Sequence, residues 1–185
     1  MTLLLVAHVL LFPALVLLWT VIPAAIWLGD RGPVFYTQVR VGKGGRSFRL
    51  IKFRTMIQNA EADTGPVWAG RADRRITDTG RFLRRFRLDE LPQVINMWKG
   101  EMSLVGPRPE RPELVENFSR DIPDFSQRLM VRPGFAGLAQ VRGRYSTRPR
   151  HKLRYDNLYI QRMTPWLDIK LIFQSVWVVV RGSPH

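Results

Sequence analysis

The feature that most constrains the fold is an uncharged apolar run at the start of the chain. From Leu3 to Leu28 no side chain carries a formal charge, and only His8 and Thr20 interrupt the apolar residues. As a straight helix this run would be roughly 39 Å long, whereas the hydrocarbon core of a bilayer is roughly 30 Å thick. The run therefore predicts a segment that inserts into a membrane.

Three interpretations of this run differ in how it meets the membrane. A cleaved signal peptide is disfavoured, because no Lys or Arg precedes the run and no small-residue cleavage site follows it before Asp30. A plain spanning helix and a re-entrant helix, which enters and leaves on one side, both stay open. Pro13 and Pro23 are expected to kink either one, because proline removes an amide donor and clashes with the preceding turn. On the residues alone the plain span is slightly favoured, since prolines also occur in ordinary transmembrane helices.

Beyond this run the chain is strongly basic. It has 29 Lys and Arg against 15 Asp and Glu, which gives a net charge of +14 over 185 residues. Such a surface attracts anions, whether nucleic acid, anionic lipid or phosphorylated small molecules. The stretch from Arg31 to Arg54 holds basic residues and no acidic one, and the positive-inside tendency places such a flank in the cytoplasm. The absence of cysteine excludes disulfide scaffolds, thiol catalysis and Cys-ligated metal centres.

After residue 30 the residue patterns predict short strands and helices. Val34–Val41 and Ser47–Arg54 are typical of strands, and the Gly-rich residues between them predict a hairpin. Thr164 is expected to cap a final apolar helix whose Trp166 suits the depth of lipid headgroups. Helices are expected at about 80–86, 89–99, 112–118, 123–130, 151–163 and 166–180, loops at 58–78 and 142–154, an extended segment at 103–109, and a turn at 132–134.

The residues that point to chemistry are Asp89 and Glu90, adjacent carboxylates just after a cluster of arginines. A structural role is the plainer alternative, since Asp is a good N-cap and Glu suits the first turn of a helix. Adjacent carboxylates can also hold Mg²⁺ through their oxygens while one of them attacks phosphorus. Because a carboxylate and a diphosphate repel each other, such a site would need arginines and a cation to neutralise the charge.

Arginines suited to that purpose occur close by in the sequence. Arg84 comes shortly before the acidic pair, Arg108 lies between two prolines, and Arg132 precedes another proline. Flanking prolines stiffen the backbone and so fix where the side chain points. Arginine binds phosphate through two parallel hydrogen bonds, which lysine cannot do. The alternative for each arginine is a solvated basic face or a contact with lipid headgroups.

A series of short motifs follows one another along the chain: Gly32–Gln38, Lys52–Met56, Leu88–Gln93, Gly100–Pro109, Val131–Gly134, Gly137–Gln140, Tyr155–Asp156 and Leu167–Lys170. In this order the motifs resemble those of the bacterial sugar transferases, the monotopic phosphoglycosyl transferases that start glycan assembly on a polyprenol carrier. The resemblance covers the chain from about Gly32 to Val179, and so many motifs in one order are highly specific.

The resemblance implies that a sugar phosphate passes from a UDP-sugar to undecaprenyl phosphate, with release of UMP. It implies Asp89 as the nucleophile, which would form an aspartyl phospho-sugar intermediate, and Glu90 as its acidic partner. Both carboxylates would serve as Mg²⁺ ligands. The resemblance also implies substrate contacts for six further charged residues: Lys52, Arg84, Arg108, Arg132, Asp156 and Asp168. It assigns no particular role to the two aspartates among them.

The resemblance also implies a fold class and a location. Family members insert a helix-break-helix that does not cross the bilayer, so it favours re-entrant insertion of residues 1–29. Residues 30–185 would form a catalytic domain on the cytoplasmic face of the bacterial plasma membrane. The expected fold is α+β, with the broken helix, a β-hairpin and several helices, some amphipathic and interfacial. Membrane lipid is an expected partner, later glycosyltransferases of the same pathway are candidates, and nucleic acid is not expected.

Two other functions stay open. A membrane-tethered basic module could bind nucleic acid or anionic lipid, which the net charge and the basic segment 142–154 would suit. Against it, no nucleic-acid-binding motif and no stacking-aromatic pattern is recognisable. An inactive relative could scaffold glycan assembly, and the intact Asp89, Glu90 and Arg108 argue against that.

Overall fold

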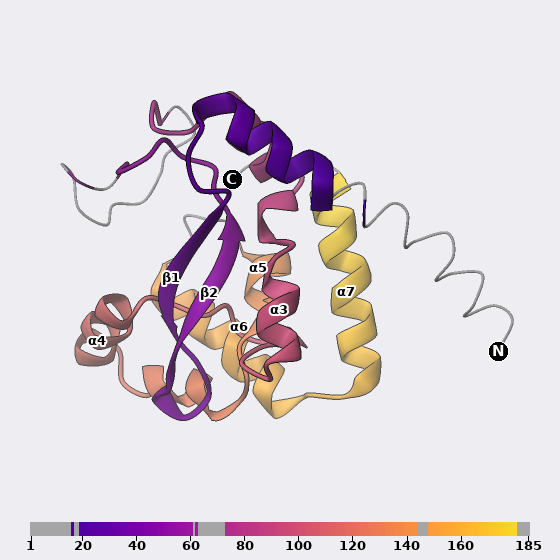
Figure 1. Cartoon of the computed structure of the whole chain (residues 1–185). Helices are drawn as coiled ribbons and strands as arrows, with labels where there is room; N and C mark the ends of the chain where they lie inside the picture. The colour runs from indigo at the N-terminus through magenta and orange to yellow at the C-terminus, as the bar shows by residue number, and fades with distance from the viewer. Residues whose placement is uncertain (1–15, 17–18, 61, 63–72, 144–147, 181–185) are drawn as a thin grey trace, which may run out of the picture.

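The computed structural model describes residues 16, 19–60, 62, 73–143 and 148–180 (Figure 1). They form an α+β fold of two small sheets and surrounding helices. The strands are β1 (Phe35–Val41), β2 (Ser47–Phe53), β3 (Ser103–Val105) and β4 (Gly134–Ala136). The helices after residue 30 are α2 (Asp78–Arg85), α3 (Gln93–Trp98), α4 (Pro112–Asp121), α5 (Leu138–Arg142), α6 (Pro149–Gln161) and α7 (Pro165–Val180). Three 3₁₀ turns, η1 (Lys43–Gly45), η2 (Leu88–Glu90) and η3 (Phe125–Met130), complete the set.

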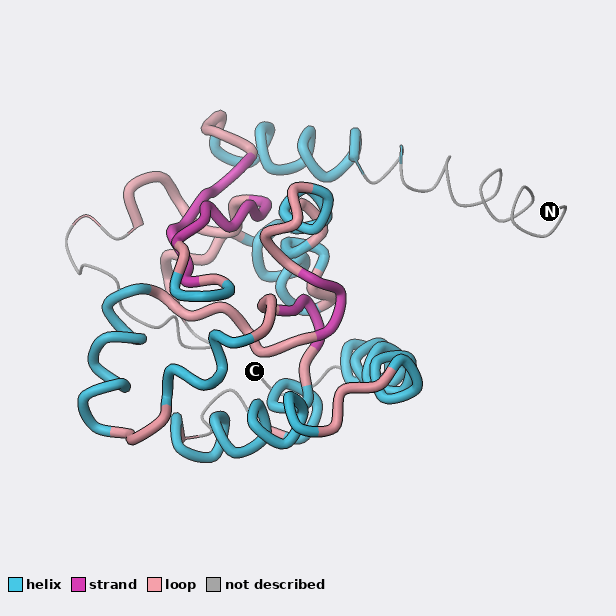
Figure 2. The backbone as a smooth tube through the Cα atoms, turned by 90° about the horizontal axis from the view of Figure 1, so that it is seen from below, coloured by secondary structure: helices cyan, strands magenta, loops and turns pink. Residues whose placement is uncertain are grey.

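A helix over residues 19–30 precedes the first strand and lies across one end of the molecule (Figures 1 and 2). Its buried Ile22 and Ile26 pack against Phe53 of β2 and Leu83 of α2. The helix continues through Pro23 without interruption. Pro13 and the rest of the predicted break lie outside the described residues, and no described helix is both long enough and apolar enough to cross a membrane.

The predicted hairpin is confirmed. β1 and β2 pair antiparallel from Phe35 opposite Phe53 to Val41 opposite Ser47. The turn between them places Gly44 and Gly45 at φ values of +66° and +79°, a region that glycine enters at no steric cost. In Figure 1 this hairpin stands in the middle of the molecule, with α3 beside it.

The single helix predicted at 89–99 is wrong. Asp89 and Glu90 lie instead on the separate 3₁₀ turn η2, and the regular helix α3 begins only at Gln93. Pro92 separates η2 from α3, because it has no amide hydrogen to give to a preceding carbonyl. Arg87, which takes a left-handed conformation at φ 54°, separates η2 from α2. The division leaves both acidic side chains buried rather than on an exposed first helical turn.

The turn predicted at 132–134 is also wrong at its end, because Gly134 begins strand β4. β4 pairs in parallel with β3, Ser103 opposite Gly134 and Val105 opposite Ala136. The two backbones approach so closely that a Cβ on Gly134 would lie 2.0 Å from the amide nitrogen of Gly106. This contact holds the segment after β3, which carries Arg108, against the segment after Arg132.

The C-terminal helices cover the small parallel sheet. Part of the basic segment predicted as a loop is helical, since α6 begins at Pro149, whereas residues 144–147 are not described. The predicted cap of α7 is confirmed, because the Leu167 amide donates to Thr164 Oγ1 at 3.1 Å. Leu171 of α7 is fully buried against Val105 and Tyr159, so this helix closes the core behind β3.

Candidate active site

The acidic pair lies where the apolar helix, the hairpin and α2 meet. Leu88 and Leu91 pack against the cluster around Ile22 and Ile26, and these contacts hold η2 from both sides of the pair. Asp89 is 8% exposed and Glu90 is 5% exposed. Buried carboxylates are uncommon unless they are paired or functional. The pair therefore stands at the junction between the N-terminal helix and the rest of the fold.

Glu90 is held by two cations from distant parts of the chain. Its Oε1 accepts a hydrogen bond from Lys52 Nζ at 3.0 Å and another from an Arg108 terminal nitrogen at 2.7 Å. Lys52 comes from β2, and Arg108 comes from the proline-flanked turn after β3. Three residues that the sequence analysis singled out are thereby brought into direct contact.

These contacts determine the electrostatics of Glu90. Burial on its own would raise the pKa of the carboxyl group, but Arg108, Lys52 and Arg87 outweigh it and hold the pKa well below its usual range. In return Glu90 raises the pKa of Arg108, while burial lowers the pKa of Lys52. Glu90 is therefore ionised at neutral pH, among the cations.

Asp89 has a different environment although it is the next residue. Burial raises the pKa of its carboxyl group, Glu90 adds to this, and Lys52 opposes it. Within the described part of the chain, no side chain donates a hydrogen bond to the Asp89 carboxylate. An ionised carboxylate that is buried and not held by donors is a stronger nucleophile than one that is hydrogen-bonded.

Arg84 lies on α2 next to this centre, with its Nε donating to Thr55 Oγ1 at 2.8 Å. The close approach of α2 to the end of β2 depends on Gly80, since a Cβ there would lie 2.0 Å from the Thr55 carbonyl oxygen. The Thr77 side chain caps the helix by accepting from the Gly80 amide at 2.9 Å. Arg84 thus reaches the site from α2, and α2 can pack this close to Thr55 because residue 80 is a glycine.

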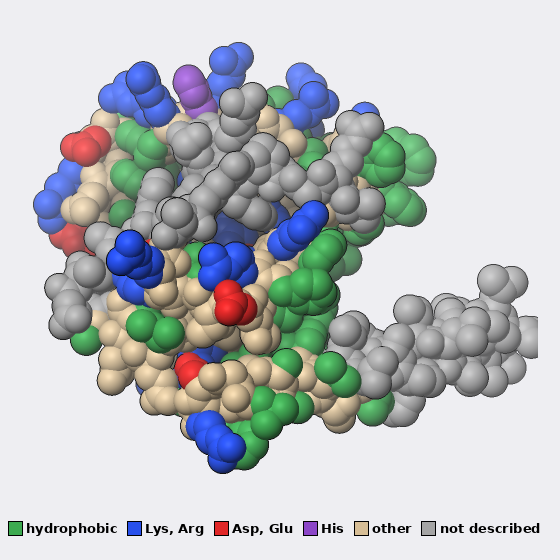
Figure 3. All heavy atoms as spheres, turned by 90° about the horizontal axis from the view of Figure 1, so that it is seen from above, with side chains coloured by type: hydrophobic (Ala, Val, Ile, Leu, Met, Phe, Trp, Pro, Cys, Tyr) green, Lys and Arg blue, Asp and Glu red, His purple; other side chains and the backbone are tan. Residues whose placement is uncertain are grey.

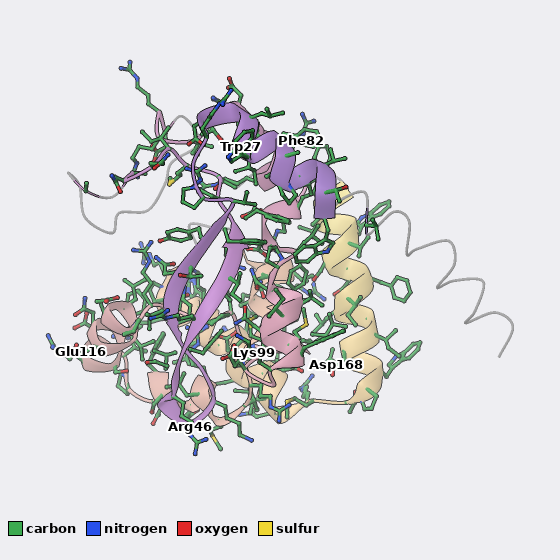
Figure 4. The ribbon with its side chains drawn as sticks, viewed as in Figure 1. Trp27, Arg46, Phe82, Lys99, Glu116 and Asp168 are labelled. Carbon is green, nitrogen blue, oxygen red and sulfur yellow. The ribbon has the colours of Figure 1, made fainter. Side chains whose placement is uncertain are left out.

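Other predicted site residues lie elsewhere. Arg132 is exposed and lines a cavity of about 540 Å³ with Lys43 and Arg46 at the hairpin tip. Figure 4 labels Arg46 at the end of the hairpin far from the helix over residues 19–30. The structure does not bring Arg132 into contact with the acidic pair, and its role in substrate binding stays a prediction.

The two downstream aspartates are also separate from the pair. Asp168, labelled on α7 in Figure 4, accepts a hydrogen bond from the Tyr159 hydroxyl at 2.9 Å. Asp156 is 1% exposed and pairs with Arg128 at 2.9 Å. Burial raises the pKa of Asp156 to about 6, against the opposing effect of Arg128. The predicted substrate contacts of both aspartates stay predictions.

Sequence reasoning missed Asn96, which ties α3 to the hairpin. Its fully buried side chain accepts from the Ile51 amide at 3.0 Å and donates to the Arg49 carbonyl at 2.8 Å. It also donates to Glu101 Oε2 at 2.6 Å. The side-chain amide thus acts as one more residue of a strand along the open edge of β2. The one available signal was a weak helix former inside an apolar helical pattern.

The donor set at the acidic pair fits a hard divalent cation. Glu90 Oε2 is buried, and no hydrogen-bond donor among the described residues reaches it. It lies beside a second carboxylate, and Mg²⁺ is commonly held by one or two carboxylates together with substrate phosphate and water. The described residues contain no group of three or more His, Cys, Asp or Glu side chains placed to hold a metal. A cation here would therefore take its other ligands from substrate and solvent.

Comparison with known proteins identifies what this chain resembles. A family description named bacterial sugar transferase matches residues 2–182. The chain is 44% identical over 160 residues to the UDP-N-acetylgalactosamine-undecaprenyl-phosphate N-acetylgalactosaminephosphotransferase of Aeromonas hydrophila, covering 85% of this chain and 38% of the relative. It is 41% identical over 167 residues to the UDP-glucose:undecaprenyl-phosphate glucose-1-phosphate transferase of Xanthomonas campestris pv. campestris, covering 86% and 34%.

A third relative has another sugar in its name. The chain is 37% identical over 166 residues to the undecaprenyl-phosphate galactose phosphotransferase of Salmonella typhimurium, covering 82% of this chain and 34% of the relative. The chain thus spans well under half the length of these three relatives. Their names share undecaprenyl phosphate and differ in the sugar.

Proposed function

Because the chain belongs to the bacterial sugar transferase family, we propose that it transfers a sugar phosphate from a UDP-sugar to undecaprenyl phosphate, releasing UMP. The observation that carries the proposal is the arrangement at η2. Asp89 lies next to Glu90, and Glu90 Oε1 is held by both Lys52 and Arg108. A basic binding module for nucleic acid or lipid has no need of a buried acidic pair, so that alternative is not favoured.

In the first step the Asp89 carboxylate attacks the phosphorus atom that carries the sugar. A bond forms between Asp89 oxygen and this phosphorus, the bond from phosphorus to the oxygen bridging it to UMP breaks, and UMP leaves with that electron pair. Arg108 and Lys52 lie next to the position where negative charge gathers. Positioning and charge neutralisation are the main contributions of a protein to phosphoryl transfer.

In the second step a phosphate oxygen of undecaprenyl phosphate attacks the same phosphorus atom. The new phosphorus–oxygen bond forms as the bond to Asp89 breaks, which restores the carboxylate and gives the undecaprenyl-diphospho-sugar. Both substrates thus use one phosphate-binding centre in turn, as expected for a double displacement. The exposed part of Arg108, whose side chain is 37% exposed, would contact each incoming phosphate.

Mg²⁺ is the proposed cofactor, with Asp89 and Glu90 as its protein ligands. Bound there, the ion would neutralise the charge of the diphosphate and so reduce its repulsion of the Asp89 carboxylate. Glu90 Oε2, which no described donor reaches, supports this assignment. Lys52 and Arg108 hold the other oxygen of Glu90 and thereby orient Oε2.

The lipid substrate requires the site to lie at a membrane surface, and we place the chain on the cytoplasmic face of the bacterial plasma membrane. One side of α7 exposes Trp166, Ile169, Phe173 and Trp177, which is unusual for a helix bathed in water. The helix over residues 19–30 adds exposed Trp27 and Leu28. Figure 3 shows hydrophobic side chains gathered along one side of the molecule, with Lys and Arg side chains around them. Re-entrant insertion of residues 1–29 belongs to the same proposal.

A screen for UMP release tests this function. The chain in detergent would be incubated with Mg²⁺, undecaprenyl phosphate and, separately, UDP-N-acetylgalactosamine, UDP-glucose and UDP-galactose. UMP release should require both undecaprenyl phosphate and Mg²⁺ for repeated turnover. The Asp78→Asn variant, which changes an exposed aspartate of α2, serves as the matched control for Asp89→Asn. The same turnover in Asp89→Asn as in the control would refute Asp89 as the nucleophile.

A further inference from the structure

Arg108 lies on a turn that has few backbone hydrogen-bond donors of its own. Pro107 and Pro109 flank it and have no amide hydrogen, so the local backbone lacks the donors that stabilise an ordinary turn. The Arg108 side chain nevertheless reaches Glu90 Oε1 at 2.7 Å. Something outside the turn must therefore fix the direction in which this side chain points.

Three consecutive carbonyl groups of the turn accept hydrogen bonds from three different segments. The Pro107 carbonyl accepts from the Gly134 amide at 2.9 Å. The Arg108 carbonyl accepts from a terminal nitrogen of Arg128 at 2.8 Å. The Pro109 carbonyl accepts from a terminal nitrogen of Arg40 at 3.0 Å. Two of these three donors are arginine side chains that the proposed reaction does not use.

Arg128 is built into the interior. It lies on η3, is 5% exposed, and stacks over the Phe125 ring at 5.0 Å. The nitrogen that donates to Arg108 also lies 2.9 Å from Asp156 Oδ2. Burying a guanidinium is costly unless it is paired, and Asp156 supplies the pairing charge. Asp156 therefore fixes the guanidinium that in turn fixes the Arg108 carbonyl.

Arg40 approaches the same turn from β1. One of its terminal nitrogens bonds the Pro109 carbonyl, and the other donates to Gln38 Oε1 at 2.6 Å. Glu110, the residue after the turn, lies 3.8 Å from both Arg40 and Arg128. Hydrogen bonds from the hairpin and from η3 thus hold the turn on two sides.

We propose that Arg128, oriented by Asp156, and Arg40 are positioning residues that hold the Pro107–Pro109 turn so that Arg108 stays on Glu90. The expected effect on turnover rests on the proposed function. The hydrogen bonds that hold the turn do not depend on it. A displacement of about 1 Å at a reacting centre can cost about 100-fold in rate, so loss of either carbonyl contact should be visible in catalysis.

A double-mutant cycle distinguishes positioning from a general contribution to the fold. Arg128→Lys keeps the charge, but an ammonium cannot reproduce the planar fork that bonds Arg108 and faces Asp156. We expect it to lower kcat about tenfold, with a smaller change in the KM for the UDP-sugar. In an Arg108→Gln background the same change should have no further effect, because there is no guanidinium left to position. Effects that multiply in the double variant would overturn the proposal.

Hydrogen exchange reports on the turn without any turnover. The amides of Gly106 and Gly134, which donate to the Ala136 and Pro107 carbonyls, should exchange faster in Arg128→Lys and in Arg40→Lys than in the parent chain, with amides far from the turn unchanged. Arg120→Lys, an exposed arginine on α4, is the matched control and should leave the turn unaffected. If the parent chain releases no UMP, the proposed function fails. Hydrogen exchange would still show whether Arg40 and Arg128 hold the turn. Unchanged exchange of the Gly106 and Gly134 amides in both variants would refute the proposal, and Arg40→Lys gives the answer alone if Arg128→Lys does not fold.

Discussion

Asp89 and Glu90 are adjacent in the chain and both buried, yet the pKa values of their carboxyl groups shift in opposite directions. Burial raises the pKa of Asp89, whereas Arg108 and Lys52 overcome burial at Glu90 and lower its pKa. Pairs of acids whose environments separate their pKa values often mark different roles in one site. Here the pattern suits a nucleophile beside a partner that is ionised at neutral pH.

Asp89→Asn should abolish turnover and stabilise the fold. The folded-state pKa of Asp89 lies above its unfolded value, so at neutral pH the ionised carboxylate opposes folding. Replacing it with a neutral isostere removes that cost, and Tm should rise by about 2–4 °C for each kcal/mol gained. UMP release should fall by at least about 1,000-fold. Thermal unfolding and UMP assays beside Asp78→Asn test both parts, and a lower Tm in Asp89→Asn would contradict the first.

Glu90→Gln should act in the opposite direction on stability. The change removes the charge between Lys52 and Arg108, and hydrogen bonds to charged groups contribute about 1.5–3 kcal/mol. We expect the free energy of unfolding to fall by about 2 kcal/mol. The control is Glu116→Gln, on the outer side of α4 in Figure 4, whose exposed pair with Arg120 should contribute less than about 1 kcal/mol. Equal denaturant midpoints for the two variants would argue against the Glu90 ion pairs.

The stability of the parent chain relative to Asp156→Asn should depend on pH. Asp156 faces Arg128, Glu110 and Lys152, and burial raises its pKa to about 6. Because the folded pKa exceeds the unfolded one, the stabilising effect of protonation is full below about pH 4 and disappears as pH rises through about 6. The difference in unfolding free energy between the two proteins should change by on the order of 2–3 kcal/mol over that window. Urea titrations at several pH values measure it, and a flat difference would show that burial does not control this carboxyl group.

Two glycine substitutions should change the free energy of unfolding in opposite directions. A Cβ at Gly80 would lie 2.0 Å from the Thr55 carbonyl oxygen, so Gly80→Ala must push α2 away and should cost about 1–3 kcal/mol. It should also lower turnover, since Arg84 would lose its bond to Thr55. At Gly29 the nearest atom is 4.0 Å away, so Gly29→Ala in a helix should gain about 0.5–1 kcal/mol. Chemical denaturation of both variants checks the pair, and a tolerated Gly80→Ala would refute the tight docking of α2.

Local patterns in the sequence predicted the hairpin and the cap of the last helix. The strand residues with glycines between them, and the Thr164–Pro165 pair, act on neighbours within a few residues. The division of the predicted helix at 89–99 escaped the same reasoning. Pro92 interrupts the hydrogen bonding between η2 and α3, but proline is also common in the first turn of a helix, so the residue type did not show where the regular helix would begin.

The parallel pairing of β3 with β4 also escaped sequence reasoning. Its partners, such as Ser103 and Gly134, are far apart in the chain, and only the close approach of Gly106 and Gly134 makes the pairing possible. The same long-range packing carries Arg128 to the turn of Arg108, a contact for which the sequence holds no signal.

The order of residues alone shows which chemical groups the protein has and in what motifs: an apolar start, an adjacent acidic pair and arginines next to prolines. Motifs of this kind are local, so they survive in a linear reading of the chain. Folding brings Lys52 and Arg108 together on one oxygen of Glu90, and among the described side chains it leaves the Asp89 carboxylate without a hydrogen-bond donor. Burial and charge pairing arise from residues that folding brings together across long stretches of chain, and these two quantities set the pKa values on which the proposed chemistry depends.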